Sequence, residues 1–112
     1  MGTSMLTTLD WVAIGDDLDG HGFAVTPPLL TADECDGLSA GFDDPSLWRS
    51  TVVMARHGYG QGVYRYFADP LPPLVAGLRA GLYPPLAAIA NRWVRQLGGT
   101  PWPEQHHDLR AR

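Results

Sequence analysis

The chain contains no lysine, and all eight of its basic residues are arginines. Its one cysteine, Cys35, excludes an internal disulfide and a zinc site built from cysteines. No apolar run approaches the roughly 20 residues that a membrane helix needs. The start of the chain lacks the basic and then apolar pattern of a secretory signal. With 112 residues, 45% of them hydrophobic, the sequence predicts a single cytoplasmic globular domain over residues 1–112.

Basic charge is also missing from the first part of the chain. Residues 1–48 carry nine acidic groups and no basic one, whereas residues 49–112 carry eight arginines and three acids. The two parts can pack together and neutralise each other, or the arginine-rich part can face an anionic partner. The net charge of −4 weighs against nucleic acid as that partner.

The first half of the chain carries two helical patterns. An apolar stripe through Trp11, Ile14 and Leu18 predicts a helix over about residues 8–18. Thr31 and Glu34 have the spacing of a capping box, which predicts the start of a second helix.

Cys35 falls in this second helix, on the same face as Leu38 and Phe42. That position predicts a small core residue rather than a nucleophile.

The second half of the chain predicts one interrupted helical region. Pro72-Pro73 suit a helix start, and Leu74, Leu78 and Leu82 form a stripe after them. Pro84-Pro85 are expected to break or kink the helix. A strong amphipathic pattern then runs from residue 86 to residue 97 and ends at a glycine pair. Residues 100–112 are polar and predict a poorly packed tail.

Between the helical parts, the sequence predicts a β-hairpin from about residue 51 to residue 67. Residues 51–55 and 63–67 read as strands, with Tyr64 and Tyr66 on one face of the second strand. The glycine-rich loop between them predicts a turn rather than a phosphate-binding loop, because a strand follows and lysine is absent. The fold class is therefore α+β, with three or four helices and a small antiparallel hairpin or sheet.

The hairpin also concentrates polar and aromatic side chains within eleven residues: Arg56, His57, Tyr59, Tyr64, Arg65 and Tyr66. Arginines interleaved with aromatic residues can bind nucleic acid by phosphate contact and base stacking. The alternative is a hairpin with one solvated face and aromatic cross-strand pairs, and we favour this interpretation.

Several stretches resemble the N-terminal part of a bacterial family of 2-oxoglutarate- and Fe(II)-dependent oxygenases, described as prolyl-hydroxylase-like. The resemblance covers roughly residues 10–99. The stretches that carry it are Trp48-Arg49-Ser50, Met54-Ala55-Arg56-His57-Gly58, Tyr64-Arg65-Tyr66-Phe67, Leu71-Pro72-Pro73-Leu74 and Ala90-Asn91-Arg92-Trp93. The resemblance implies a dioxygenase (an oxidoreductase) that holds Fe(II) through a His-x-Asp and a later histidine on a double-stranded β-helix.

That core lies beyond the stretch that carries the resemblance, so we expect a truncated fragment that is inactive as this chain alone. We expect no cofactor here, although Fe(II) and 2-oxoglutarate serve the full-length family. Expected partners are the missing catalytic core or a protein that covers exposed apolar surface. Within the resemblance, the first candidates for contact with substrate are Arg56, His57, Tyr64 and Tyr66. The alternative function is a small module that binds protein or nucleic acid through the hairpin.

Near the end of the chain, His106 and Asp108 form a His-x-Asp. No histidine follows to complete an iron site, and in the resembling family the iron motif lies far beyond the helix that contains Trp93. We therefore interpret this motif as a chance match and predict no metal site. Residues 104–112 are expected to begin a helix.

Overall fold

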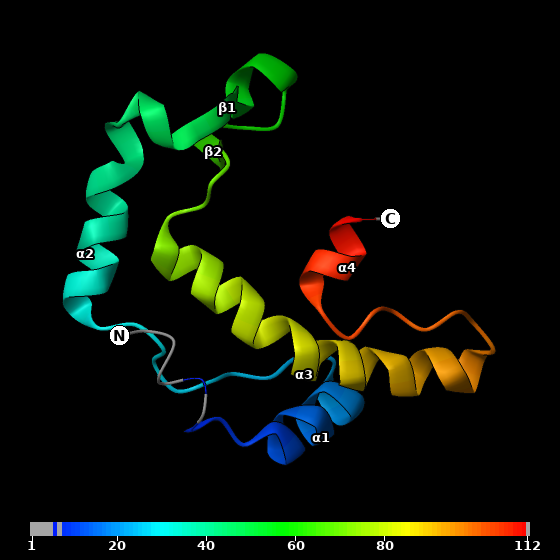
Figure 1. The fold of residues 1–112 in the computed structure, drawn as a ribbon. Coiled ribbons are helices and arrows are strands. Elements are labelled where there is room, and N and C mark those ends of the chain that lie inside the picture. The colour runs from blue at the N-terminus through cyan, green and yellow to red at the C-terminus, as the bar shows by residue number, and fades with distance from the viewer. Residues whose placement is uncertain (1–5, 7, 112) are drawn as a thin grey trace. The chain divides into compact units, whose positions relative to one another are not determined.

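The computed structural model describes residue 6 and residues 8–111. Its helices and strands follow the order α1 (Trp11–His21), α2 (Ala32–Ala40), β1 (Trp48–Val53), β2 (Val63–Phe67), α3 (Pro73–Leu97) and α4 (His106–Arg110), as Figure 1 shows. Short 3-10 turns η2 (Gly41–Asp43), η3 (Pro45–Leu47) and η4 (Met54–His57) link some of them. The predicted α+β class is confirmed, with four helices, one two-stranded antiparallel sheet and no closed barrel in the described residues.

The contacts within the chain group it into two compact units. The helical unit consists of Met1–Thr31 and Leu74–Arg112, and the hairpin unit consists of Ala32–Pro73. The helical unit therefore contains α1, nearly all of α3, and α4. The hairpin unit contains α2 and the sheet. None of the helices in residues 8–111 combines the length and apolar character needed to cross a membrane.

Helix α1 begins at Trp11, three residues after the predicted start near residue 8, because Asp10 caps it. The Asp10 carboxylate accepts a hydrogen bond from the Ala13 N–H at 3.0 Å. The helix ends at Gly22, whose φ of 79° lies in the left-handed region and whose N–H donates to the Leu18 carbonyl.

Helix α1 packs on α3 at Gly15, which is buried. A Cβ added there would lie 3.1 Å from Arg92 Nη2 and 3.7 Å from Ile89 Cδ1. Glycine therefore permits the close approach of the two helices.

Helix α3 starts at Pro73, as predicted, and continues through Pro84 and Pro85. Figure 1 shows that its axis changes direction near the middle, so the proline pair kinks the helix without ending it. Gly98, with φ 74°, ends the helix where the glycine pair predicted.

The core of the helical unit is small. Among the residues that the structure describes, Leu6, Leu9, Ala87 and Ile89 form its buried apolar part, and Asn91 is a buried polar residue. The hairpin unit has no buried residue. Accordingly, Cys35 is exposed, and its prediction as a core residue is wrong. The helix that carries it, α2, begins where Thr31 and Glu34 predicted but has no core to enter within its unit.

Candidate functional site

Strands β1 and β2 pair antiparallel, and their register sets which side chains share a face. Thr51 lies opposite Arg65, Val52 opposite Tyr64, and Ser50 opposite Tyr66. A bulge between Trp48 and Ser50 shifts the register at the start of β1. The first strand thus begins at Trp48, three residues before the predicted start, and it brings Arg49 into the hairpin.

One face of the hairpin carries an exposed group of aromatic and cationic side chains, which we call the Tyr–Arg face (Arg49, Tyr64 and Tyr66). The Tyr64 and Tyr66 rings meet edge to face with centroids 5.5 Å apart. The Arg49 guanidinium lies 5.3 Å from the centre of the Tyr66 ring. The two tyrosines are 42% and 46% exposed, so their rings are accessible to a ligand.

The two tyrosine hydroxyls also interact. A side-chain hydrogen bond with Tyr66 is the main cause that raises the pKa of Tyr64 above its usual value, and loss of solvation adds to it.

The opposite face of the hairpin is packed more tightly. Trp48 stacks on Phe67 with ring centroids 4.4 Å apart, and its Nε1 donates to the Phe42 carbonyl at 2.9 Å. Arg65 Nε donates to Thr51 Oγ1 at 3.1 Å, and its Nη1 donates to the Phe42 carbonyl. This face holds the hairpin to the turn η2.

The four residues predicted for substrate contact separate into two places. Tyr64 and Tyr66 lie together on the Tyr–Arg face, whereas Arg56 and His57 lie exposed in the turn η4. His57 stacks on Tyr59 instead, with ring centroids 6.1 Å apart. The sequence prediction did not include Arg49, because it started the first strand at residue 51. A strand that starts at Trp48, as β1 does, contains Arg49.

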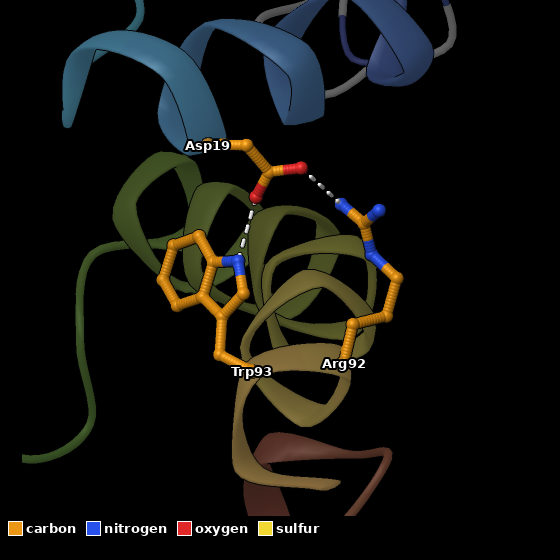
Figure 2. Close-up of polar contacts among 3 residues, drawn as sticks. All are labelled: Asp19, Arg92 and Trp93. Atoms are coloured by element: carbon orange, nitrogen blue, oxygen red, sulfur yellow. Dashed lines mark hydrogen bonds and ion pairs between the residues drawn. The ribbon is translucent and has the colours of Figure 1, made fainter. Parts of the chain in front are cut away.

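A second polar cluster lies in the helical unit, between α1 and α3. Figure 2 shows Asp19 between Trp93 and Arg92. Trp93 Nε1 donates to Asp19 Oδ1 at 2.6 Å, and Arg92 Nη2 lies 3.5 Å from Asp19 Oδ2. A cavity of about 660 Å³ lies beside them and is also lined by Gln96. Because the Asp19 carboxylate of α1 contacts both Arg92 and Trp93 of α3, the cluster links the two helices.

Asn91 makes a similar connection to the segment after α3. Its amide nitrogen donates to the Trp102 carbonyl at 3.0 Å, and its oxygen accepts from the Trp102 N–H at 2.7 Å. Tyr83 adds a hydrogen bond from its hydroxyl to the Pro103 carbonyl at 2.8 Å. The segment expected to be a poorly packed tail is thus tied to α3 at two points, and the start of the expected terminal helix is present as α4.

The His-x-Asp of α4 does not assemble a metal site within the described residues. His106 contacts the Tyr83 ring edge at a centroid distance of 5.5 Å, whereas Asp108 pairs with its neighbour His107 at 3.2 Å. In the part of the chain that the structure describes, no group of three His, Cys, Asp or Glu residues is placed to hold a metal ion. The described residues therefore do not fit the iron centre that the resemblance implies.

Comparison with known protein families gives a match in the second half of the chain. Residues 62–112 match the model of a family described as "Oxygenase, catalysing oxidative methylation of damaged DNA". No curated protein and no solved structure matches the chain. The matched stretch is a little under half of the chain and includes β2, α3 and α4. It overlaps the resemblance identified from the sequence and supports an oxygenase family for this chain.

Proposed function

We propose that this chain is the substrate-side part of an Fe(II)- and 2-oxoglutarate-dependent oxygenase that acts on DNA. In this proposal its hairpin unit supplies a surface on which bases stack. The sequence resemblance pointed to prolyl-hydroxylase-like enzymes, but the matched family is described by its action on damaged DNA. That description favours DNA over a peptide as the substrate.

The single observation that carries the proposal is the Tyr–Arg face. It combines two exposed tyrosine rings with an arginine held against one of them. Aromatic side chains of this kind stack on bases without regard to sequence, and each stacked base contributes about 1–3 kcal/mol. Arginine adds attraction for the phosphate backbone.

The acidic residues that give the chain its net negative charge lie outside the hairpin strands and the loop between them. Residues 48–67 contain three arginines and no acidic residue. The acidic groups of the hairpin unit belong to α2, to the turns before β1 and to Asp69. The hairpin itself therefore has the local positive charge that a nucleic-acid site requires.

In the proposed enzyme, Fe(II) and 2-oxoglutarate are held by residues other than those described here. We therefore assign this chain binding of substrate and no chemical step. The purified chain should release no succinate when it is supplied with Fe(II), 2-oxoglutarate and methylated single-stranded DNA. Iron-dependent succinate release from the isolated 112 residues would contradict this assignment.

Fluorescence anisotropy with a labelled single-stranded oligodeoxynucleotide tests the binding surface. Tyr66→Ala should weaken binding by about tenfold, because it removes one stacking ring and the support of Arg49. Tyr66→Phe should keep most of the affinity. Phe23→Ala is the matched control, since it removes a ring that is 65% exposed in the helical unit. Absence of binding at low salt, or equal losses for Tyr66→Ala and Phe23→Ala, would refute the proposal.

A second candidate function is a protein-binding module, and exposed apolar side chains of the helical unit favour it. Val12, Val25 and Leu97 are strongly exposed, together with Phe23. Exposed apolar side chains mark a partner site where they form a contiguous patch larger than a few hundred Å². A well-dispersed NMR spectrum of a monomer that binds no hydrophobic dye would argue against a protein partner for these side chains.

A further inference from the structure

A second exposed aromatic pair lies in the turn that joins β1 to β2 (Figure 1). We call His57 and Tyr59 the turn pair. Their ring centroids are 6.1 Å apart, and the ring planes are inclined by only 21°. Tyr59 is 72% exposed, more than either tyrosine of the Tyr–Arg face, so most of its ring is accessible to a ligand.

Backbone hydrogen bonds hold the turn that carries this pair. The Tyr59 N–H donates to the Met54 carbonyl at 3.2 Å, and the Met54 N–H donates to the Gly62 carbonyl at 2.9 Å. Gly58 ends the turn η4 with a φ of 71°, in the left-handed region. The pair is therefore presented on a preformed turn, which lowers the entropy cost of binding. Because the Tyr59 bond uses its backbone, a substitution of its side chain keeps that bond.

The turn pair lies beyond the last paired residues of the sheet, Val53 and Val63. It is thus at the end of the hairpin and belongs to neither face of the sheet. Tyr66 follows Val63 by three residues, and at about 3.4 Å per residue this part of β2 is about 10 Å long. A stacked nucleic-acid strand advances about 3.4 Å per nucleotide. A strand that contacts both Tyr66 and the turn pair therefore needs roughly four nucleotides.

Arg56 brings positive charge to the same turn. It is exposed in η4, directly before His57. Residues 48–67 contain no acidic residue that could compete with a phosphate for it. The turn thus combines an exposed ring with a cation, as the Tyr–Arg face does, and these are the two contacts that single-stranded nucleic acid requires.

We infer that the turn pair is a second stacking contact for the DNA strand that the Tyr–Arg face binds, with Arg56 on the phosphates of that strand. The inference rests on the proposed function and makes its ligand more specific. The ligand is a single strand of roughly four nucleotides or more rather than one base. Two weak contacts joined by one strand bind it more tightly than either contact alone.

NMR titrations of the 112-residue chain with a thymidine dinucleotide and with an oligothymidylate of about eight nucleotides test the inference. The amide signals of Tyr64 and Tyr66 report both affinities. Tyr59→Ala should weaken binding of the longer strand by at least about fivefold, which is the lower end of the loss of one stacked base. It should leave binding of the dinucleotide unchanged, because two nucleotides are too short to reach both contacts. Tyr59→Phe keeps the ring and should keep the affinity, and Gln61→Ala, exposed in the same turn, is the matched control.

The salt dependence tests the phosphate contact separately. Arg56→Gln should reduce the slope of log affinity against log salt concentration by about 0.7 for the longer strand. An arginine that only shaped the turn would not change this slope. Arg95→Gln, at an exposed position of α3, removes the same charge from the helical unit and should leave the slope unchanged. An equal slope in Arg56→Gln and the unsubstituted chain would refute the phosphate contact.

The outcomes separate this inference from the proposed function. If Tyr66→Ala weakens binding of the longer strand while Tyr59→Ala has no more effect than Gln61→Ala, the second contact is refuted and the proposed function stands. Equal losses for the dinucleotide and the longer strand in Tyr59→Ala would also refute the second contact, because the substitution would then act through the fold of the hairpin. If neither ligand binds at low salt, the proposed function fails and the second contact fails with it.

Discussion

The helical unit and the Tyr–Arg face of the hairpin unit use similar side chains in different ways. In the helical unit, Arg92 and Trp93 are bonded to Asp19, and Asn91 is bonded to the backbone at Trp102. In the hairpin unit, Arg49 and the two tyrosines of the Tyr–Arg face contact one another and remain exposed. Arginine and aromatic residues thus fasten elements together where a carboxylate or a carbonyl faces them, and they remain accessible where none does.

The largest expected difference between the units concerns core packing. Ile89 is only 7% exposed and lies against α1 at Gly15. Ile89→Ala should lower the free energy of unfolding of the helical unit by about 2–4 kcal/mol, because it removes buried methyl groups and leaves a cavity. Chemical denaturation measures this loss. Leu97→Ala, at a position that is 86% exposed, is the control and should change stability little. Equal effects of the two substitutions would mean that the helical unit has no specific core.

A smaller effect is expected at the buried amide of Asn91. Asn91→Ala removes two hydrogen bonds to Trp102 and should destabilise residues 101–111 by about 1–3 kcal/mol. Hydrogen exchange at the Trp102 N–H reports this directly, since that group donates to Asn91. Gln96→Ala, on an exposed position of α3, is the control. Unchanged protection at Trp102 would show that Asn91 does not hold the segment.

The hairpin and helix α3 show which features could be predicted from the sequence and which could not. Alternation in residues 63–67 was enough to place Tyr64 and Tyr66 on one face, because strand geometry has a period of two. The stripe from Leu86 to Leu97 was enough to predict a helix. The partners of Asn91, Arg92 and Trp93 were not predictable. Asp19, which contacts Arg92 and Trp93, is distant in sequence, and Asn91 bonds to backbone groups of Trp102, which carry no sequence signal. Cys35 was misplaced for a related reason: its apolar stripe was real, but no layer covers it within its unit.

A smaller effect again is expected from the polar cluster between α1 and α3. Asp19→Asn keeps the size of the side chain but removes the charge that attracts Arg92. Both partners are partly exposed, so the loss should be about 0.5–1 kcal/mol. Thermal denaturation of Asp19→Asn, Arg92→Gln and the double variant gives the coupling between the two side chains. Asp16→Asn, on an exposed position of α1, is the control. A coupling near zero would mean that the ion pair adds nothing to the packing at Gly15.

The smallest expected effect is a pH dependence in the attachment of α4. His106 lies against the Tyr83 ring, and loss of solvation is the main cause that lowers its pKa below the usual value of 6.5. Positive charge from Arg79 on α3 and from Arg110 and His107 on α4 adds to the shift. Protonation of His106 therefore weakens the packing of α4 against Tyr83 of α3.

The direction of the pH effect follows from this shift. Because the pKa of His106 is lower in the folded chain, the unfolded state binds more protons below pH 6.5. The contribution of His106 is fully present above that pH and is lost as the pH falls through the lowered pKa. Hydrogen exchange in α4 should therefore speed up on acidification.

His106→Phe keeps a ring against Tyr83 but cannot titrate, so its exchange should follow only the intrinsic chemical rate. His107→Phe, at an exposed position, should retain most of the pH response. An identical response in His106→Phe and the unsubstituted chain would assign the effect to other groups, and the contact with Tyr83 would then be packing alone.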